Sequence, residues 1–142
     1  MKLEERSWNS AGGWDGPARA GLDAQVALVF GATSPLSRVG LFPELRAFYP
    51  RATLFGCSTA GEIRGTTISD EGVVVTAVEL EHSTVRTIAV PLHEAADSRD
   101  AGARLAVALP REQLRHVLVL SDALAVNGSE LVGGLTGGLP PG

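Results

Sequence analysis

Three short apolar runs, each ended by small polar residues, are the clearest pattern in the chain. Residues 25–32 (QVALVFGA), 52–57 (ATLFGC) and 116–121 (HVLVLS) are nearly continuous apolar segments. Runs of this length are typical of strands that are buried on both faces of a sheet covered by helices. The pattern therefore predicts three buried strands, which we expect to be parallel neighbours.

A second pattern predicts a hairpin in the middle of the chain. Residues 72–81 and 84–90 are rich in β-branched side chains, and a short polar link separates them. Two strand-like segments joined by so short a link favour antiparallel pairing.

Apolar residues at helical spacing predict three helices, over residues 38–49, 97–109 and 129–135. Asp97 or Ser98 is expected to cap the second helix, and Asn127 or Ser129 the third. The predicted order is β-α-β-β-β-α-β-α. This order indicates an α/β fold class, with a mixed β-sheet flanked by helices.

The first 23 residues differ from the rest of the chain. Their turn-forming residues argue against regular structure: Asn9, Gly12, Gly13, Gly16, Pro17 and Gly21. We expect an irregular N-terminal arm at residues 1–23, anchored by Trp8 and Trp14, or else a frayed terminus. A single domain over residues 24–142 follows it.

Composition narrows the function classes. The chain has 142 residues, a net charge of −4, 44% hydrophobic residues and 20% charged residues, which is typical of one folded domain. The acidic balance argues against nucleic-acid binding, and no apolar run reaches the roughly 20 residues of a membrane span. Without a signal-peptide pattern and with Cys57 as the single cysteine, a cytoplasmic location is expected. We expect no metal and no cofactor.

Small polar residues follow each of the three predicted buried strands. Ligand sites in open α/β sheets lie at the carboxyl ends of strands, so these residues are expected to line one small polar pocket. The candidate ligand-binding residues are Thr33, Ser34, Cys57, Ser58, Thr59, Gly61, Glu62, Ser121, Asp122 and Asn127. The alternative is that they are ordinary loop and helix-cap residues.

Two carboxylates in this set have two interpretations each. Glu62 can accept hydrogen bonds from an ammonium or hydroxyl group of a ligand, or it pairs with Arg64 or faces water. Asp122 can hold a ligand amine, or it caps the turn that follows it.

Catalytic patterns are weak. Ser58 stands in a G-x-S-x-A context, but no helix is predicted directly after it, as a hydrolase nucleophile would need. Cys57 closes an apolar strand, where a lone cysteine usually packs as a small hydrophobic residue. The glycines of residues 133–138 lack the order and the lysine of a phosphate loop.

Residues 55–63 (FGCSTAGEI) resemble the signature of the FIST N domain, a bacterial sensory module. Further similarity comes in the same order along residues 24–139, at Ala27–Phe30, Phe48–Ala52, Asp70–Ala77 and Leu120–Leu131. Several motifs in register make the resemblance more specific than any one of them.

The resemblance implies a non-catalytic signal-transduction domain that senses a small polar ligand, with amino acids as one candidate class. It also implies a FIST C domain or a signalling output module as partner. Family members continue beyond this chain, which implies a domain truncated at its C-terminus. An exposed strand edge would then favour a homo-oligomer. The alternatives are a hydrolase- or thiol-type enzyme using Ser58 or Cys57, and an interaction fragment that binds no ligand.

Overall fold

The computed structural model describes residues 1–16 and 21–139. The chain forms two compact units, Met1–Val85 and Arg86–Gly142. The first unit holds all the strands of the described residues, and the second holds the two longest helices.

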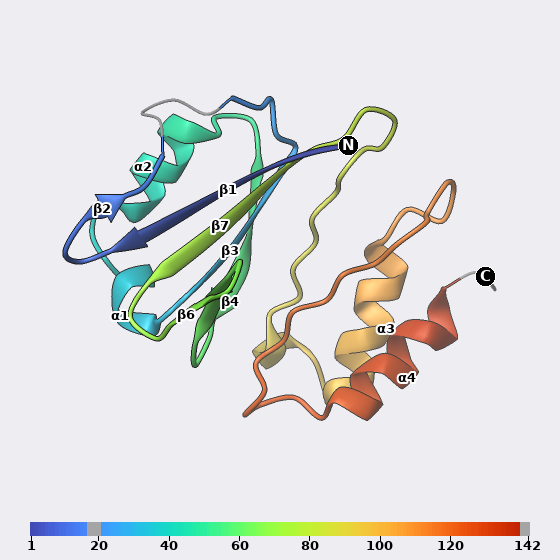
Figure 1. Ribbon diagram of the computed structural model, residues 1–142. Helices are drawn as coiled ribbons and strands as arrows, with labels where there is room; N and C mark the ends of the chain where they lie inside the picture. Colours follow the sequence, from blue (N-terminus) through green and yellow to red (C-terminus); the bar gives the residue numbers. More distant parts are fainter. Residues whose placement is uncertain (17–20, 140–142) are drawn as a thin grey trace. The chain divides into compact units, whose positions relative to one another are not determined.

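A mixed five-stranded sheet forms the first unit, in the order β2-β1-β7-β3-β4 (Figure 1). Strand β3 is parallel to β4, whereas β7 runs antiparallel to both β1 and β3. The elements are β1 (Lys2–Asn9), β2 (Gly13–Trp14), β3 (Val26–Gly31), α1 (Thr33–Leu36), α2 (Leu41–Phe48), β4 (Thr53–Ser58), β5 (Glu62–Arg64), β6 (Thr67–Ser69) and β7 (Val73–Glu79). The predicted fold class, α/β with a mixed sheet, is confirmed.

Helix α2 covers one face of this sheet. Alternate residues of β3 and β7 are buried, as period-2 side-chain alternation requires. They pack with Leu41, Leu45 and Tyr49 from α2 and the residue after it. The predicted helix over 38–49 and the predicted strands over 25–32 and 52–57 are therefore present; α2 and β3 are shorter than predicted, and β4 is shifted by one residue. The expectation that the second strand is buried on both faces is wrong, because β4 is the last strand of the sheet and has no buried residue.

The expectation of an irregular N-terminal arm is wrong for its first residues. Lys2–Asn9 forms β1, which pairs with β7 from Lys2 opposite Glu79 to Trp8 opposite Val73. Trp8 and Trp14 do pack against the core, so their predicted anchoring role is confirmed. Residues 17–20 of the arm lie outside the described residues.

Two predicted strands do not form. Residues 84–90 and 116–121 have no strand structure. A strand at 84–90 would need a place beside β7, and both neighbouring places are taken by β1 and β3. A β-branched sequence forms a strand only where a partner accepts its backbone hydrogen bonds. The polar stretch before β7 instead folds into the β5–β6 hairpin, with Gly65 at φ +57° in its turn.

The second unit contains a short 3₁₀ turn, η1 (Leu92–Glu94), and the helices α3 (Ser98–Ala108) and α4 (Gly128–Gly138). Asp97 accepts a hydrogen bond from the Asp100 amide at 2.8 Å, and Asn127 accepts one from the Glu130 amide at 3.1 Å. Both predicted caps are confirmed. None of the helices in the described residues has the length and apolar character needed to cross a membrane. The predicted C-terminal truncation concerns an end, residues 140–142, that lies outside the described residues.

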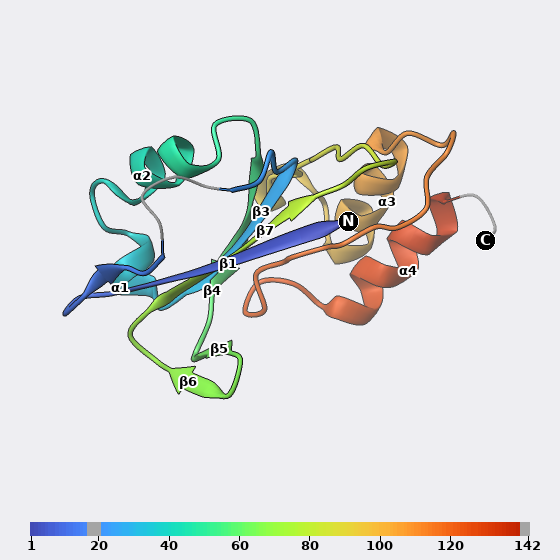
Figure 2. The ribbon, with the colours of Figure 1, turned by 45° about the horizontal axis from the view of Figure 1, so that its top comes forward.

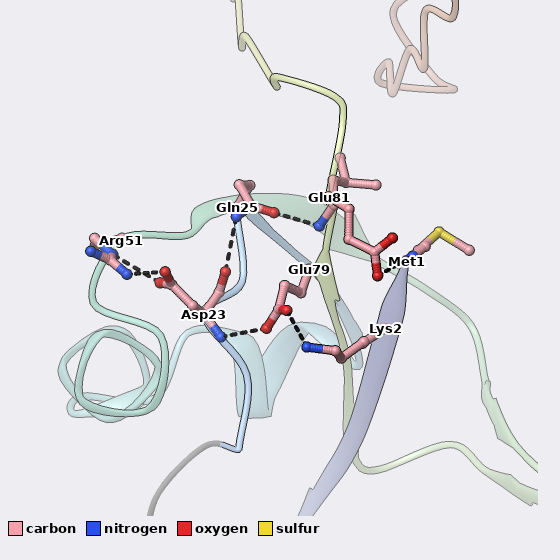
Figure 3. A network of polar contacts seen from close by, with 8 residues as sticks. Met1, Lys2, Asp23, Gln25, Arg51, Glu79 and Glu81 are labelled. Atoms are coloured by element: carbon pink, nitrogen blue, oxygen red, sulfur yellow. Dashed lines mark hydrogen bonds and ion pairs between the residues drawn. The ribbon is translucent and has the colours of Figure 1, made fainter.

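Ion pairs and hydrogen bonds close one edge of the sheet, where β1 and β3 begin and β7 ends (Figure 3). Glu79 accepts hydrogen bonds from Lys2 Nζ at 2.6 Å and from the Asp23 amide at 3.0 Å. Arg51 pairs with Asp23, and Gln25 accepts from the Leu80 amide at 2.6 Å. This edge is thus closed by the chain's own side chains.

A cluster of polar side chains, centred on the buried Arg6, lies between β1 and α2. Arg6 is only 1% exposed, and its Nε donates to Glu4 at 3.0 Å and to the Tyr49 hydroxyl at 3.1 Å. The Tyr49 hydroxyl donates to Glu4 at 2.6 Å, and the Arg6 guanidinium stacks on the Phe48 ring. These contacts let a charged residue occupy a core position of β1.

Tyr49 provides a direct spectroscopic test of this cluster, because it is the single tyrosine of the chain. Burial, together with the hydrogen bond to Glu4, raises the pKa of Tyr49 to about 12 from its ordinary value of 10.0. In the unfolded chain the phenol ionises near pH 10. The contribution of the neutral Tyr49 side chain to the free energy of unfolding is therefore complete below that pH and is lost as pH rises toward 12. Phenolate absorbance should therefore rise with a midpoint about 2 units higher in the folded protein than in denaturant. Equal titration midpoints in the folded protein and in denaturant would contradict the burial of the Tyr49 hydroxyl beside Glu4.

Candidate functional site

The edge of the sheet opposite the polar network brings several turns together. Because β1 and β3 both run antiparallel to β7, their carboxyl ends lie at the same edge, where β7 begins. Strand β4 is parallel to β3 and ends there too. The Ala32 amide donates to the Gly72 carbonyl at 3.0 Å, and the Thr59 amide donates to the Gly31 carbonyl at 2.9 Å. This is the edge at which ligand sites of such sheets are expected.

Glu62 is buried at this edge, with only 2% of its surface exposed. Its Oε1 accepts from the Thr59 hydroxyl at 2.8 Å, and its Oε2 accepts from the Gly72 amide at 3.3 Å. The interpretation of Glu62 as a partner of Arg64 or as a solvent-facing charge is wrong. No cationic side chain in the described ranges lies within ion-pair distance of this carboxylate.

Arg64 turns instead toward the N-terminal strands. Its Nη1 donates to the Ser7 hydroxyl at 3.0 Å and to the Asp15 carboxylate. Asp15 also accepts from the Ser7 amide at 2.6 Å. Burial acts to raise the pKa of Asp15, but the hydrogen bonds from Ser7 and Arg64 outweigh it and hold that pKa below its ordinary value. Asp15 is therefore an anionic support for Arg64.

A hollow of about 530 Å³ lies between β1, the start of β7 and the β5–β6 hairpin. Figure 2 shows the hairpin standing away from the main sheet at this edge. The charged residues of the lining are Glu5, Glu62 and Arg64. The other lining residues are Ser7, Trp8, Asn9, Gly65, Thr66, Thr67, Ser69, Gly72, Val73 and Val74. The first hollow thus joins one buried carboxylate, one guanidinium and several hydroxyl groups.

A second hollow of about 600 Å³ shares Trp8 with the first. Its lining consists of Trp8, Ser10, Ala32, Ser34, Pro35, Arg38, Asp70 and Glu71. The Arg38 guanidinium stacks on the Trp8 ring at 4.6 Å and donates to both oxygens of Glu44, at 3.0 and 2.6 Å. Glu44 thus occupies both Nη atoms of Arg38, whereas the hydrogen bonds of Arg64 in the first hollow use Nη1 alone.

The structure brings together only part of the predicted set. Glu62 lines the first hollow with its hydrogen-bond partner Thr59 beside it, and Ser34 lines the second. Thr33, Cys57, Ser58 and Gly61 are exposed near the same edge. The exposure of Cys57 corrects the expectation that it packs as a buried residue, because β4 is the last strand of the sheet.

The three remaining candidates belong to the second unit, where they have local roles or none that is visible. Asp122 accepts from the Leu124 amide at 2.8 Å, which confirms its turn-capping interpretation. Asn127 caps α4, and Ser121 is exposed in a loop. The sequence argument placed them at or after the carboxyl end of a strand at 116–121, which does not form.

Sequence reasoning missed the contribution of the N-terminal residues to the first hollow. Ser7, Trp8 and Asn9 line it because β1 is a strand of the sheet, and Arg64 lines it because residues 62–69 form a hairpin. Residues 2–8 (KLEERSW) have no apolar alternation that would predict β1, and the glycines after them favoured an arm. Among the described residues, no three potential metal ligands cluster.

Comparison with known proteins gives one match. A family model described as FIST N domain matches residues 25–142. No curated protein and no solved structure matches the chain.

Replacing Thr59 with valine tests the support of the buried carboxylate. The change keeps the shape of the side chain but removes the hydroxyl that donates to Glu62. A buried acceptor that loses its donor costs about 1–3 kcal/mol, so the free energy of unfolding should fall by that amount in denaturant titration. The matched change Thr67→Val, at an exposed position of β6, should stay within about 0.5 kcal/mol of the wild type. Equal effects of the two changes would contradict the burial of Glu62.

Proposed function

The chain belongs to the FIST N domain family of signal-transduction sensory domains, and from this membership we propose that it binds a small polar molecule in the first hollow. The observation that carries the proposal is Glu62, a carboxylate that is buried at the wall of the hollow and has no cation of the described residues beside it. The role of the domain is then to sense that molecule, not to transform it.

The chemistry of Glu62 favours a ligand with an ammonium group. Buried carboxylates in proteins are usually paired with cations, because hydrogen bonds from neutral donors compensate only part of the lost hydration. Thr59 and Gly72 supply two such neutral donors. An ammonium group in the hollow would supply the missing positive charge and charge-assisted hydrogen bonds.

Arg64 favours a second, anionic group on the same ligand. Both hydrogen bonds that Arg64 makes to described residues come from Nη1. Its Nε and Nη2 atoms therefore still have N–H groups that can donate to a carboxylate in the bidentate geometry typical of arginine. Opposite charges in one small hollow suit a zwitterion. Amino acids are the simplest molecules of this class, and we propose them as the ligands.

The proposed site is smaller than the set predicted from the sequence. It consists of Glu62 and Thr59 from the predicted set, with Ser7, Trp8 and Arg64 added from β1 and the hairpin. The exposed residues Thr33, Cys57, Ser58 and Gly61 stay candidates for the rim of the same edge. A FIST C domain or a signalling output module in the cytoplasm is the proposed recipient of the signal.

The alternative as a hydrolase or thiol enzyme has less support. Its nucleophile would need a hydrogen-bonded base, such as a histidine. In the part of the chain that the structure describes, neither Ser58 nor Cys57 has a side-chain hydrogen bond to a histidine.

Thermal unfolding with a panel of the twenty standard amino acids tests the proposal. A ligand at a hundred times its dissociation constant stabilises by about 2.7 kcal/mol, so the melting temperature should rise by several degrees. Glu62→Gln should remove this shift, because it removes the charge but keeps the shape. The matched variant Glu94→Gln changes an exposed glutamate of the second unit and should keep the shift.

Two results would contradict the proposal. One is a wild-type protein that no panel member stabilises. The other is a Glu62→Gln variant that folds and shows the full ligand-induced shift.

A further inference from the structure

Residues outside the family match form one wall of the first hollow. The family model begins at residue 25, whereas β1 and β2 lie at Lys2–Asn9 and Gly13–Trp14. The wall residues Glu5, Ser7, Trp8 and Asn9 all come from β1. The opposite wall comes from the β5–β6 hairpin, whereas the start of β7 lies beside β1 in the sheet. Both the hairpin and β7 lie inside the matched region.

Arg64 connects the two walls. Arg64 of β5 donates to the Ser7 hydroxyl of β1 and to Asp15, which directly follows β2. Asp15 is fixed in turn to β1, since its carboxylate accepts from the Ser7 amide and its own amide donates to the Ser7 carbonyl at 2.9 Å. The contact therefore sets how far the hairpin lies from β1.

The hairpin depends on such contacts for its position. A two-stranded hairpin alone is marginally stable in water. Ile63 and Ile68, a cross-strand pair, are 71% and 76% exposed and contribute little burial. Glu62 holds one end of the hairpin, through Thr59 and Gly72, and Arg64 holds the other end of β5.

We propose that the N-terminal segment Lys2–Asp15 is the specificity-determining wall of the ligand site, and that Asp15 is the positioning residue that fixes its distance from the hairpin through Arg64. This inference rests on the proposed function of the first hollow. A hollow of fixed width discriminates between ligands of different size, because binding then needs no reordering of its walls. Asp15 does not line the hollow itself, so it acts through Arg64.

Asp15→Asn tests the connection without any ligand. Asparagine can still accept from the Ser7 amide, but it no longer attracts the guanidinium. The ion pair is partly exposed, with side-chain exposures of 37% and 38%, and the contribution of such pairs is small. Hydrogen exchange of the hairpin amides should become about two- to fivefold faster relative to amides of β3 and β7.

The matched control is Asp23→Asn, which removes the same charge and also breaks an ion pair with an arginine. Asp23 belongs to the polar network at the opposite edge of the sheet (Figure 3), so the hairpin amides should exchange as in the wild type. Hairpin exchange that is unchanged in Asp15→Asn, or that rises equally in both variants, overturns the inference.

Binding to the twenty standard amino acids provides the second measurement. Asp15→Asn should weaken binding of the preferred panel member about two- to fivefold and narrow the differences between panel members, whereas Asp23→Asn should change neither. If Asp15→Asn binds the preferred amino acid as tightly as the wild type does and ranks the panel members in the same way, this inference is overturned and the proposed function is not. A wild type that binds no panel member overturns the proposed function, and this inference with it.

Discussion

The double pairing of β7 is the constraint on which the first unit depends. This strand pairs along its length with β1 on one side and with β3 on the other, both antiparallel. The two ladders bury one face of β7 beneath α2 and bring the carboxyl ends of β1 and β3 to the place where β7 begins. Gly72, just before β7, can then donate its amide to Glu62, and the first hollow opens between these segments.

Two glycines show how closely the backbones approach around this edge. A Cβ on Gly56 would lie 1.7 Å from the Val29 carbonyl oxygen, so β4 could not keep its place beside β3. A Cβ on Gly72 would lie 2.9 Å from the Ser69 hydroxyl and 3.1 Å from the Trp8 carbonyl oxygen. The glycines at these two positions therefore have a packing role, and Gly72 also brings its amide close to the buried carboxylate.

Local sequence signals predicted the helices and strands that are determined by residues close together in the chain. Apolar runs gave β3 and β4, helical spacing gave α2, α3 and α4, and side-chain chemistry gave the caps Asp97 and Asn127. Strand β1 could not be predicted in this way, because its partner β7 is distant in sequence and its buried Arg6 is compensated by Tyr49 and Glu4. The same competition for β7 leaves residues 84–90 unpaired despite their strand-like composition. The rule that ligands bind at strand ends led to the edge of the first unit where Glu62 lies, but it took residues 116–121 as the third strand at that edge, where the structure has β1.

The central claim is that a small zwitterionic molecule binds between β1 and the β5–β6 hairpin, at Glu62. Mapping amide chemical shifts of the wild-type protein, with the amino acid that stabilises it most, tests this claim most directly. The largest changes should fall on the amides of Ser7, Thr59, Glu62 and Gly72, which surround the first hollow or support its carboxylate. Changes confined to other parts of the chain, such as the loop of Ser121 and Asp122, would contradict the claim.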